Sequence, residues 1–245
     1  PAEGRGVTGP PVGRAVAPYG GGERDEIVRA SDLALYSAKN GGRGAFRFYS
    51  SDLKDEAEER RELEEDLRQA LAADQLQLHY QPVVRASDSM VVGCEALMRW
   101  EHPERGPIDP AVFITVAQES TLIVQLGEWA LRRACEDAMR WPASVRVAVN
   151  VSAVQFASPG FATVVTNALA GGGLAPERLE LELTESVFMH DSDLTDESFR
   201  MLKQLGVRLA LDDFGTGYSS LSYLRSAPFD KLKVDKSFVD SCTQQ

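Results

Sequence analysis

Long apolar segments are missing from this sequence. No run of about 18 apolar residues occurs, so we expect neither a membrane-spanning helix nor the apolar core of a secretory signal in these residues. The chain begins with Pro1 instead of Met, and we expect it to be a fragment of a longer protein with a cytoplasmic location. Membrane attachment is then expected only through segments upstream of this fragment.

Cysteine and histidine are scarce, with three residues of each. The cysteines are odd in number and lack C-x-x-C spacing, which argues against a disulfide framework and against a structural zinc site. The histidines do not follow the spacing of zinc ligands either. Reduced thiols in the cytosol fit this composition best.

Basic residues are fewer than acidic residues. The chain has 26 Lys and Arg and 37 Asp and Glu, which give a formal net charge of -11. This balance argues against broad electrostatic binding to DNA, to an RNA polymer or to an anionic membrane, each of which needs a basic face. An anionic ligand would have to be held by local groups or by metal ions. The 43% hydrophobic composition is sufficient for a real core.

The first third of the chain changes character several times. Residues 1–24 are rich in glycine and proline, and we expect them to lack regular structure. Residues 25–39 predict a helix that ends at Asn40 and the glycines after it, and a short strand, AFRFY, follows. The highly charged residues 52–73 carry apolar side chains at helical spacing and predict a solvated helix that links two units.

From residue 74 onward strands alternate with helices, the pattern of an α/β fold. The strand candidates are 76–84, 91–100, 145–152, 178–185, 207–213 and 230–235. The helix candidates are 111–121, 124–140, 160–170, 193–204 and 217–224.

Alternation within four of these strands separates an aliphatic face from a polar face. In the strand 145–152, for example, the valines share one face and Asn150 lies on the other. The polar faces end near the carboxyl ends of the strands, where (β/α) barrels place their active sites. The face of Glu95 is less clear, because both faces of its strand are largely apolar. A lone carboxylate in such a setting is costly unless it is paired or bound to metal.

The polar residues at these strand ends form one set of candidate ligands. They are Glu95, Asn150, Glu182, Asp212 and Lys233, with Asp213 adjacent to Asp212. Carboxylate and amide oxygens suit Mg²⁺ or Mn²⁺. Two such ions, bridged by a shared carboxylate for which Asp212 is the candidate, can clamp a phosphate and generate hydroxide. Asp213 can join them only if the strand breaks there, which Gly215 and Gly217 allow.

Each feature has a simpler interpretation when it stands alone. An Asp-Asp pair before a glycine loop is more often a solvated turn or a helix cap than a metal site, and Lys233 alone would be a solvated charge at a sheet edge. Glu180 and Arg208 are interpreted as a structural ion pair. The recurrence of polar residues at the same end of successive strands favours the metal site.

Five ordered motifs resemble those of EAL-domain phosphodiesterases, which hydrolyse cyclic di-GMP to linear pGpG. They are EALMRW (95–100), VNVS (149–152), ELTES (182–186), DDFGTGYSSL (212–221) and KVD (233–235). The similarity covers about residues 60–240. Residues 25–51, with ASDLALYSAKNGGRG, are similar to the C-terminal end of a GGDEF, or diguanylate cyclase, domain that lacks its signature loop here.

The resemblance implies a role for each matching position. It implies metal ligation by Glu95, Asn150, Glu182 and Asp212, with Asp213 on a second ion. Lys233 would help position the attacking water, and Glu185 would support the loop that follows Asp213. The positions that match substrate contacts are Gln81, Leu97 and Arg99. A guanidinium that reaches a phosphate oxygen makes physical sense for Arg99.

The fold implied by the resemblance is a (β/α)8, TIM-barrel-like EAL domain over residues 74–245, with an antiparallel first strand and about six of its eight strands present. The implied function is hydrolysis of cyclic di-GMP with two Mg²⁺ or Mn²⁺ ions in bacterial signalling, by a GGDEF-EAL tandem protein that forms a homodimer at full length. The alternatives are a non-catalytic cyclic di-GMP receptor, an inactive truncated module and a structural dimerisation module.

Overall fold

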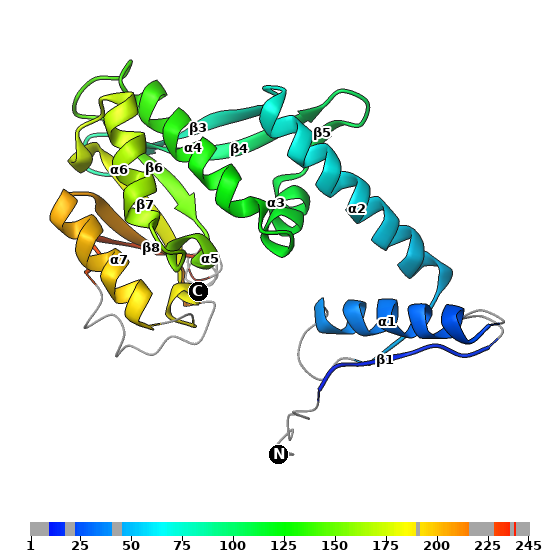
Figure 1. Ribbon diagram of the computed structural model, residues 1–245. Helices are drawn as coiled ribbons and strands as arrows, with labels where there is room; N and C mark the ends of the chain where they lie inside the picture. The colour runs from blue at the N-terminus through cyan, green and yellow to red at the C-terminus, as the bar shows by residue number, and fades with distance from the viewer. Residues whose placement is uncertain are drawn as a thin grey trace, which may run out of the picture. The chain divides into compact units, whose positions relative to one another are not determined.

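The computed structural model describes residues 10–17, 23–40, 46–189, 192–215, 228–235 and 238. The chain divides into two compact units, Pro1–Asp66 and Leu67–Gln245 (Figure 1). Among the described residues, none of the helices has the length and apolar character needed to cross a membrane.

The first unit consists of a helix packed on two short strands. Its elements are β1 (Val12–Arg14), α1 (Arg24–Asn40), β2 (Phe46–Phe48) and most of α2 (Ser51–Ala72). The predicted helices and the short strand are present. Residues 12–14, however, correct the expectation of no regular structure over 1–24, because they pair in parallel with β2. The lack of a side chain at Gly13 lets β1 approach α1 closely, since a Cβ there would overlap the backbone of Leu35.

The second unit is built on one mixed sheet. Its strands are β3 (Leu76–Val84), β4 (Val91–His102), β5 (Gly106–Ile108), β6 (Arg146–Val151), β7 (Leu179–Thr184), β8 (Arg208–Phe214) and β9 (Lys231–Val234). The order is β3-β4-β6-β7-β8-β9, and β5 pairs with β4 outside this path. β3 is antiparallel to β4, whereas the strands from β4 to β9 along this path are parallel. The α/β fold with an antiparallel first strand is thus confirmed, and β5 is an addition that the pattern does not predict.

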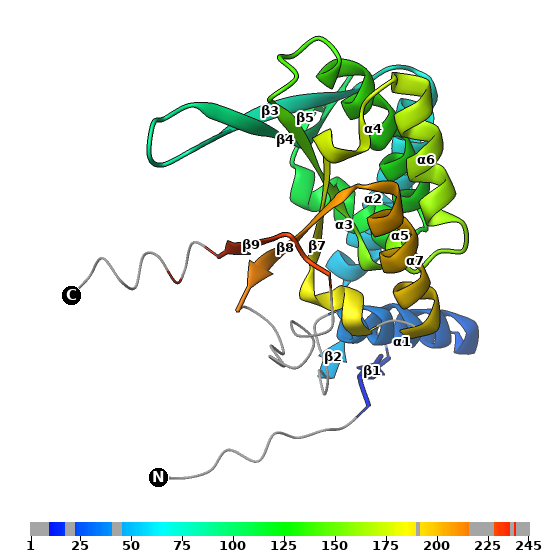
Figure 2. The same ribbon diagram turned by 90° about the vertical axis from the view of Figure 1, so that its left-hand side faces the viewer.

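The helices of this unit follow the strands as expected. They are α3 (Pro110–Glu119), α4 (Leu122–Ala138), α5 (Ala153–Phe156), α6 (Phe161–Gly172) and α7 (Ser192–Leu205), with 3-10 turns η1 (Pro176–Arg178) and η2 (Glu185–Met189). Figure 2 shows α4, α6 and α7 together on one side of the strands. The helix expected over 217–224 lies outside the described residues.

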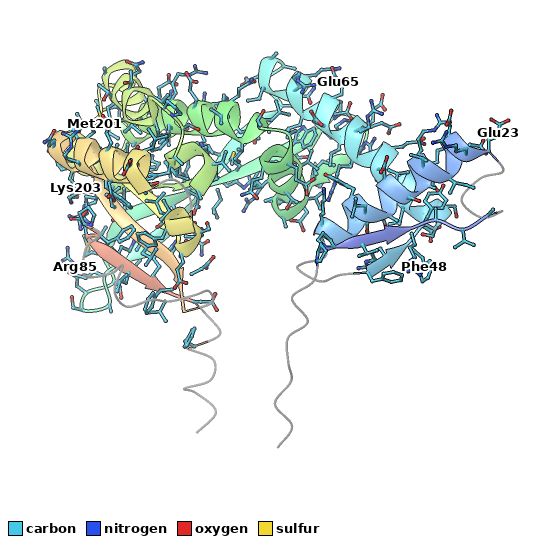
Figure 3. The ribbon with its side chains drawn as sticks, turned by 60° about the horizontal axis from the view of Figure 1, so that its bottom comes forward. Glu23, Phe48, Glu65, Arg85, Met201 and Lys203 are labelled. Atoms are coloured by element: carbon cyan, nitrogen blue, oxygen red, sulfur yellow. The ribbon has the colours of Figure 1, made fainter. Side chains whose placement is uncertain are left out.

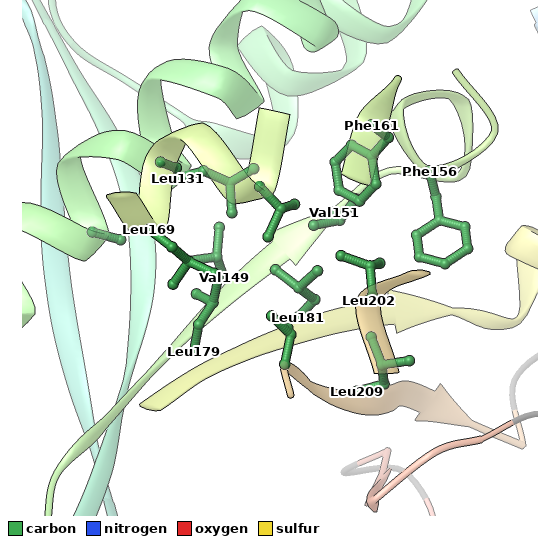
Figure 4. Packing of buried hydrophobic residues seen from close by; sticks show 14 of the residues in the cluster. Leu131, Val149, Val151, Phe156, Phe161, Leu169, Leu179, Leu181, Leu202 and Leu209 are labelled. Carbon is green, nitrogen blue, oxygen red and sulfur yellow. The ribbon is translucent and has the colours of Figure 1, made fainter. Parts of the chain in front are cut away.

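The main hydrophobic core lies between the sheet and these helices. Val149, Leu181 and Leu209 come from three adjacent strands and point toward the helices (Figure 4). Leu131 of α4 and Leu202 of α7 meet them from the other side, and both are fully buried. The aliphatic face predicted from strand alternation is therefore the face that the helices cover, which leaves the polar face to the barrel interior.

A close contact between α4 and α5 supports the end of β6. Ser152 begins α5 directly after β6, and it forms a capping box with Gln155. The Gln155 side chain is buried against Gly127 of α4, where a Cβ would overlap its amide nitrogen. The absence of a side chain at Gly127 therefore makes room for the Gln155 side chain, which caps α5 directly after β6.

Replacing Gly127 by alanine is expected to lower the free energy of unfolding by about 2 kcal/mol, because the new methyl group displaces Gln155 from its capping box. The change is measured by urea denaturation. The matched control is Gly171→Ala in α6, where nothing lies within 4 Å of the new Cβ. That variant is expected to gain about 0.5–1 kcal/mol from helix propensity alone. Equal effects of the two substitutions would contradict the close contact.

Candidate metal centre

Strand register places the predicted ligands on one face of the sheet. Glu95 is opposite Ala148 on β6, which is opposite Glu180 on β7, so Glu95 shares its face with the polar residues of the following strands. Asn150 is opposite Glu182, and Asp212 is opposite Thr184, two positions further along β7. Strand register therefore shows that Glu95 lies on the polar face of the sheet, which the apolar residues around it do not reveal in the sequence.

The ammonium of Lys233 joins three strands. It donates hydrogen bonds to three carboxylates, namely Glu182 Oε2 at 2.6 Å, Asp212 Oδ2 at 2.7 Å and Glu95 Oε2 at 3.2 Å. Asn150 joins the same group, because its Nδ2 donates to Glu95 Oε1 at 2.8 Å. All five predicted residues of the candidate centre are therefore brought together at one edge of the sheet.

The position of β9, and so of Lys233, depends on Asp230. This carboxylate accepts hydrogen bonds from Lys203 Nζ of α7 at 2.8 and 2.9 Å, and from the backbone N–H of Leu209 at 2.8 Å. Lys203 is labelled in Figure 3. Burial opposes ionisation of Asp230, but these hydrogen bonds outweigh it and lower its pKa. The carboxylate thus stays ionised and ties the start of β9 to β8 and α7.

The donor set fits a hard divalent cation. Ligand oxygens of Glu95, Glu182 and Asp212 all lie within 4.8 Å of one another. The three carboxylates and the Lys233 ammonium carry a formal net charge of -2, and the Lys231 ammonium lies 3.9 Å from Glu182 Oε1. The Glu182 side chain is only 1% exposed, and its Oε1 accepts no hydrogen bond from the described residues. A buried carboxylate oxygen in that state is costly, and a Mg²⁺ or Mn²⁺ ion would satisfy it.

Burial shifts the ionisation of these groups. It raises the pKa of Glu182 to about 7, although the hydrogen bond from Lys233 acts in the opposite direction. Burial alone lowers the pKa of Lys233, but hydrogen bonds to Asp212 and Glu182 outweigh it, so the pKa lies above its usual value. Burial and the adjacent Asp212 raise the pKa of Asp213. Lys233 is therefore held as a cation among the acids.

β8 continues to Phe214, but its pairing with β9 is irregular around Asp213, because the register shifts between Leu211 and Phe214. Asp213 has a left-handed backbone with φ of 52°, and Gly215 follows with φ of 103°. The N–H of Asp213 donates to Asp212 Oδ1 at 2.9 Å. The N–H of Gly215 donates to Glu185 Oε1 at 3.1 Å, so Glu185 contacts the turn after the paired aspartates. Gly217 lies outside the described residues.

The three positions that match substrate contacts line the β3–β4 pair beside this cluster. Gln81 is directly opposite Glu95, and Leu97 and Arg99 follow Glu95 on the same face. Gln81 is exposed and Arg99 is half-buried. The Arg99 guanidinium donates to the carbonyl oxygen of Met98 at 2.8 Å.

Lys231 lies on the same face of β9 as Lys233, and the sequence motifs predict no role for it. Its Nζ donates to Glu180 Oε1 at 2.7 Å, whereas Arg208 Nε is 3.6 Å from Glu180 Oε2. The expected Glu180–Arg208 ion pair is thus present, and Lys231 is the closer partner of Glu180. The sequence does contain the pattern that places Lys231 beside Lys233, because the two lysines alternate with Leu232 on β9.

An EAL-domain family model matches residues 64–245. This chain belongs to the EAL-domain family. A signalling protein of Caulobacter vibrioides is 50% identical to this EAL chain over 233 residues, which are 95% of the chain and 29% of that protein. MucR of Pseudomonas aeruginosa, named a bifunctional diguanylate cyclase and cyclic di-GMP phosphodiesterase, is 44% identical over 233 residues, 94% of the chain and 34% of that protein. The EAL chain therefore spans about a third of the length of these relatives.

The fold is also shared with a solved structure. The PaMucR phosphodiesterase in complex with c-di-GMP superimposes on this EAL chain with a TM-score of 0.70 and 46% sequence identity. The match covers 75% of this chain and 76% of that one. Membership of the family therefore rests on both sequence and fold.

The raised pKa of Glu182 predicts how the stability of the metal-free EAL chain depends on pH. The folded-state pKa of about 7 lies above the ordinary value of 4.5, so the folded state binds this proton more tightly. This contribution is fully present below pH 4.5 and is lost as the pH rises toward 7, with a total of about 3 kcal/mol. Urea denaturation at stepped pH, without divalent ions, measures it. Glu182→Gln cannot ionise and should flatten the slope, and equal slopes in the two proteins would contradict the assignment.

Proposed function

We propose that this EAL domain hydrolyses cyclic di-GMP to linear pGpG in a metal-dependent reaction of bacterial signalling. The observation that carries the proposal is the meeting of Glu95, Glu182, Asp212 and Lys233, from four different strands, at one edge of the sheet. Such a cluster at the carboxyl ends of parallel strands is where barrel enzymes place their catalytic groups. The likeness to MucR and to the PaMucR complex with c-di-GMP supports the same ligand.

The proposed metal ligands are Glu95, Asn150, Glu182 and Asp212, with Asp213 on a second ion. Oxygen donors of this kind accept Mg²⁺ or Mn²⁺. Bound divalent ions polarise a phosphodiester and lower the pKa of a coordinated water. The left-handed turn at Asp213 supports its proposed role, because it interrupts the alternation that would otherwise send Asp213 to the opposite face from Asp212.

The remaining roles belong to side chains around this group. Lys233 is proposed to hydrogen-bond the attacking water, since its ammonium is held among the carboxylates by short hydrogen bonds. Glu185 holds the turn at Gly215 and so the two aspartates before it. Arg99 is proposed to bind a phosphate oxygen of the ligand, beside Gln81 and Leu97. Attack of water on phosphorus then breaks one P–O bond of the ring and opens cyclic di-GMP to pGpG.

The proposed domain order is a C-terminal GGDEF remnant at residues 25–51, a linking helix at 52–73 and the EAL domain from 74 onward. The separate compact unit Pro1–Asp66 and the bifunctional name of MucR support this order. We propose a cytoplasmic location and a homodimer for the full-length protein, with any membrane attachment through other segments of it.

The function is tested by incubating the purified protein with cyclic di-GMP and Mn²⁺ or Mg²⁺, and following pGpG by chromatography. Product is expected only with the divalent ion. Glu95→Ala and Asp212→Ala are each expected to reduce the rate by about 100-fold or more, because each removes a proposed ligand. The matched control is Glu101→Ala, which removes an exposed carboxylate from the same strand as Glu95 and should leave the rate unchanged.

Two results would count against hydrolysis. Binding of cyclic di-GMP without any pGpG would indicate a non-catalytic receptor. Product that persists in both Glu95→Ala and Asp212→Ala would place the chemistry elsewhere.

A further inference from the structure

Two lysines of β9 reach across β8 to the carboxylates of β7. Ala210 of β8 is paired with Glu182 on one side and with Lys231 on the other, and β7, β8 and β9 lie side by side in Figure 2. Ala210 is fully buried, and its methyl group is the β8 side chain at the register position between Glu182 and Lys231. A larger residue on β8 would block the path from Lys231 to β7. The small side chain thus makes a second ammonium available beside the metal centre.

Lys231 stands between two acids but is bonded to one of them. Its Nζ is 2.7 Å from Glu180 Oε1 and 3.9 Å from Glu182 Oε1. The side chains of Glu180 and Glu182 are 6% and 1% exposed. Glu182 Oε1 is the buried oxygen that accepts no hydrogen bond within the described part of the chain. A shift of about 1 Å would bring Lys231 within hydrogen-bond range of that oxygen.

We propose that Glu180 is a positioning residue that binds Lys231 and thereby keeps its ammonium off Glu182 Oε1, which leaves that oxygen for the metal ion. The inference rests on the proposed metal-dependent function and deepens it. Without the Glu180 carboxylate, the other acid that forms an ion pair with Lys231 in the described part of the chain is Glu182. A charge-assisted hydrogen bond to Glu182 Oε1 would compete directly with a metal ion for that atom.

Arg208 contributes to the orientation of Glu180. Its Nε is 3.6 Å from Glu180 Oε2, while Lys231 bonds Oε1. The two cations therefore lie near different oxygens of one carboxylate, and of the two only Lys231 forms a hydrogen bond with it. The ion pair with Arg208 favours the orientation in which Glu180 bonds Lys231.

The test is Mn²⁺ binding to the full chain by isothermal titration calorimetry, without nucleotide. Glu180→Gln keeps the size of the side chain and removes its charge, and it is expected to weaken Mn²⁺ binding by about tenfold or more, because Lys231 moves to Glu182. Lys231→Met removes the competing ammonium and is expected to bind Mn²⁺ at least as tightly as the parent chain. The double variant Glu180→Gln, Lys231→Met is expected to recover binding to within about threefold of the parent.

Recovery in the double variant separates this role from a merely structural one, since a loss caused by damage to β7 would persist or grow. Unchanged binding in Glu180→Gln, or a double variant as weak as the single one, would overturn the proposal. Circular dichroism checks that each variant is folded. If Glu180→Gln does not fold, Glu180→Asp replaces it, because the shorter carboxylate also releases Lys231 and should weaken binding in the same direction, and unchanged binding there overturns the proposal.

The outcomes also separate this inference from the proposed hydrolysis. A parent chain that binds Mn²⁺ and shows the predicted pattern, but forms no pGpG, would support the role of Glu180 and reject the catalytic function. A parent chain that binds no Mn²⁺ would overturn the role of Glu180.

Discussion

The mutual repulsion of three carboxylates, offset by one ammonium, is the constraint on which the structure of this EAL domain depends. Glu95, Glu182 and Asp212 lie close together, and the pKa of Glu182 is raised by its burial and further by the charges of Glu95 and Asp212. Lys233 compensates part of this negative charge. It lies on β9, 138 residues after Glu95 in the chain. The centre can therefore form only when β4, β7, β8 and β9 are all in place, and the chemistry depends on the fold of the whole unit.

The sheet brings these four strands together because its two faces carry different kinds of side chain. Leucine and valine side chains bind the helices on one face, and charged side chains pair across strands on the other. A register shift of one residue in any of these strands would exchange the faces and place carboxylates in the helix-packed core. Hydrophobic packing on the outer face is thus what fixes the positions of the charges on the inner face. The hydrogen bonds from Lys203 and from the Leu209 N–H to Asp230 fix the position of β9 in the same way.

Much of the arrangement could be predicted because strand alternation is a local property. The positions of the strands, the aliphatic face and the convergence of Asn150, Glu182 and Asp212 follow from patterns a few residues long. An irregular backbone after Asp212 was also foreseeable, because glycines follow it, and Asp213 does adopt a left-handed conformation. Glu95 was ambiguous because both faces of its strand are apolar, and the pairing of Lys231 with Glu180 was missed because it crosses an intervening strand. The strand at 12–14 was missed because its partner lies more than thirty residues away.

The sequence by itself determined the alternation of strands and helices, the polar ends of the strands and the family to which the motifs point, since each depends on residues that are near one another in the chain. Only the tertiary structure decided which oxygen of each carboxylate meets Lys233, which acid holds Lys231 and which oxygen of Glu182 stays without a hydrogen bond. These outcomes depend on lateral register and on the size of the side chain between two strands. Both are set when distant strands pair, because hydrogen bonding and packing then fix side-chain distances that local sequence leaves undetermined.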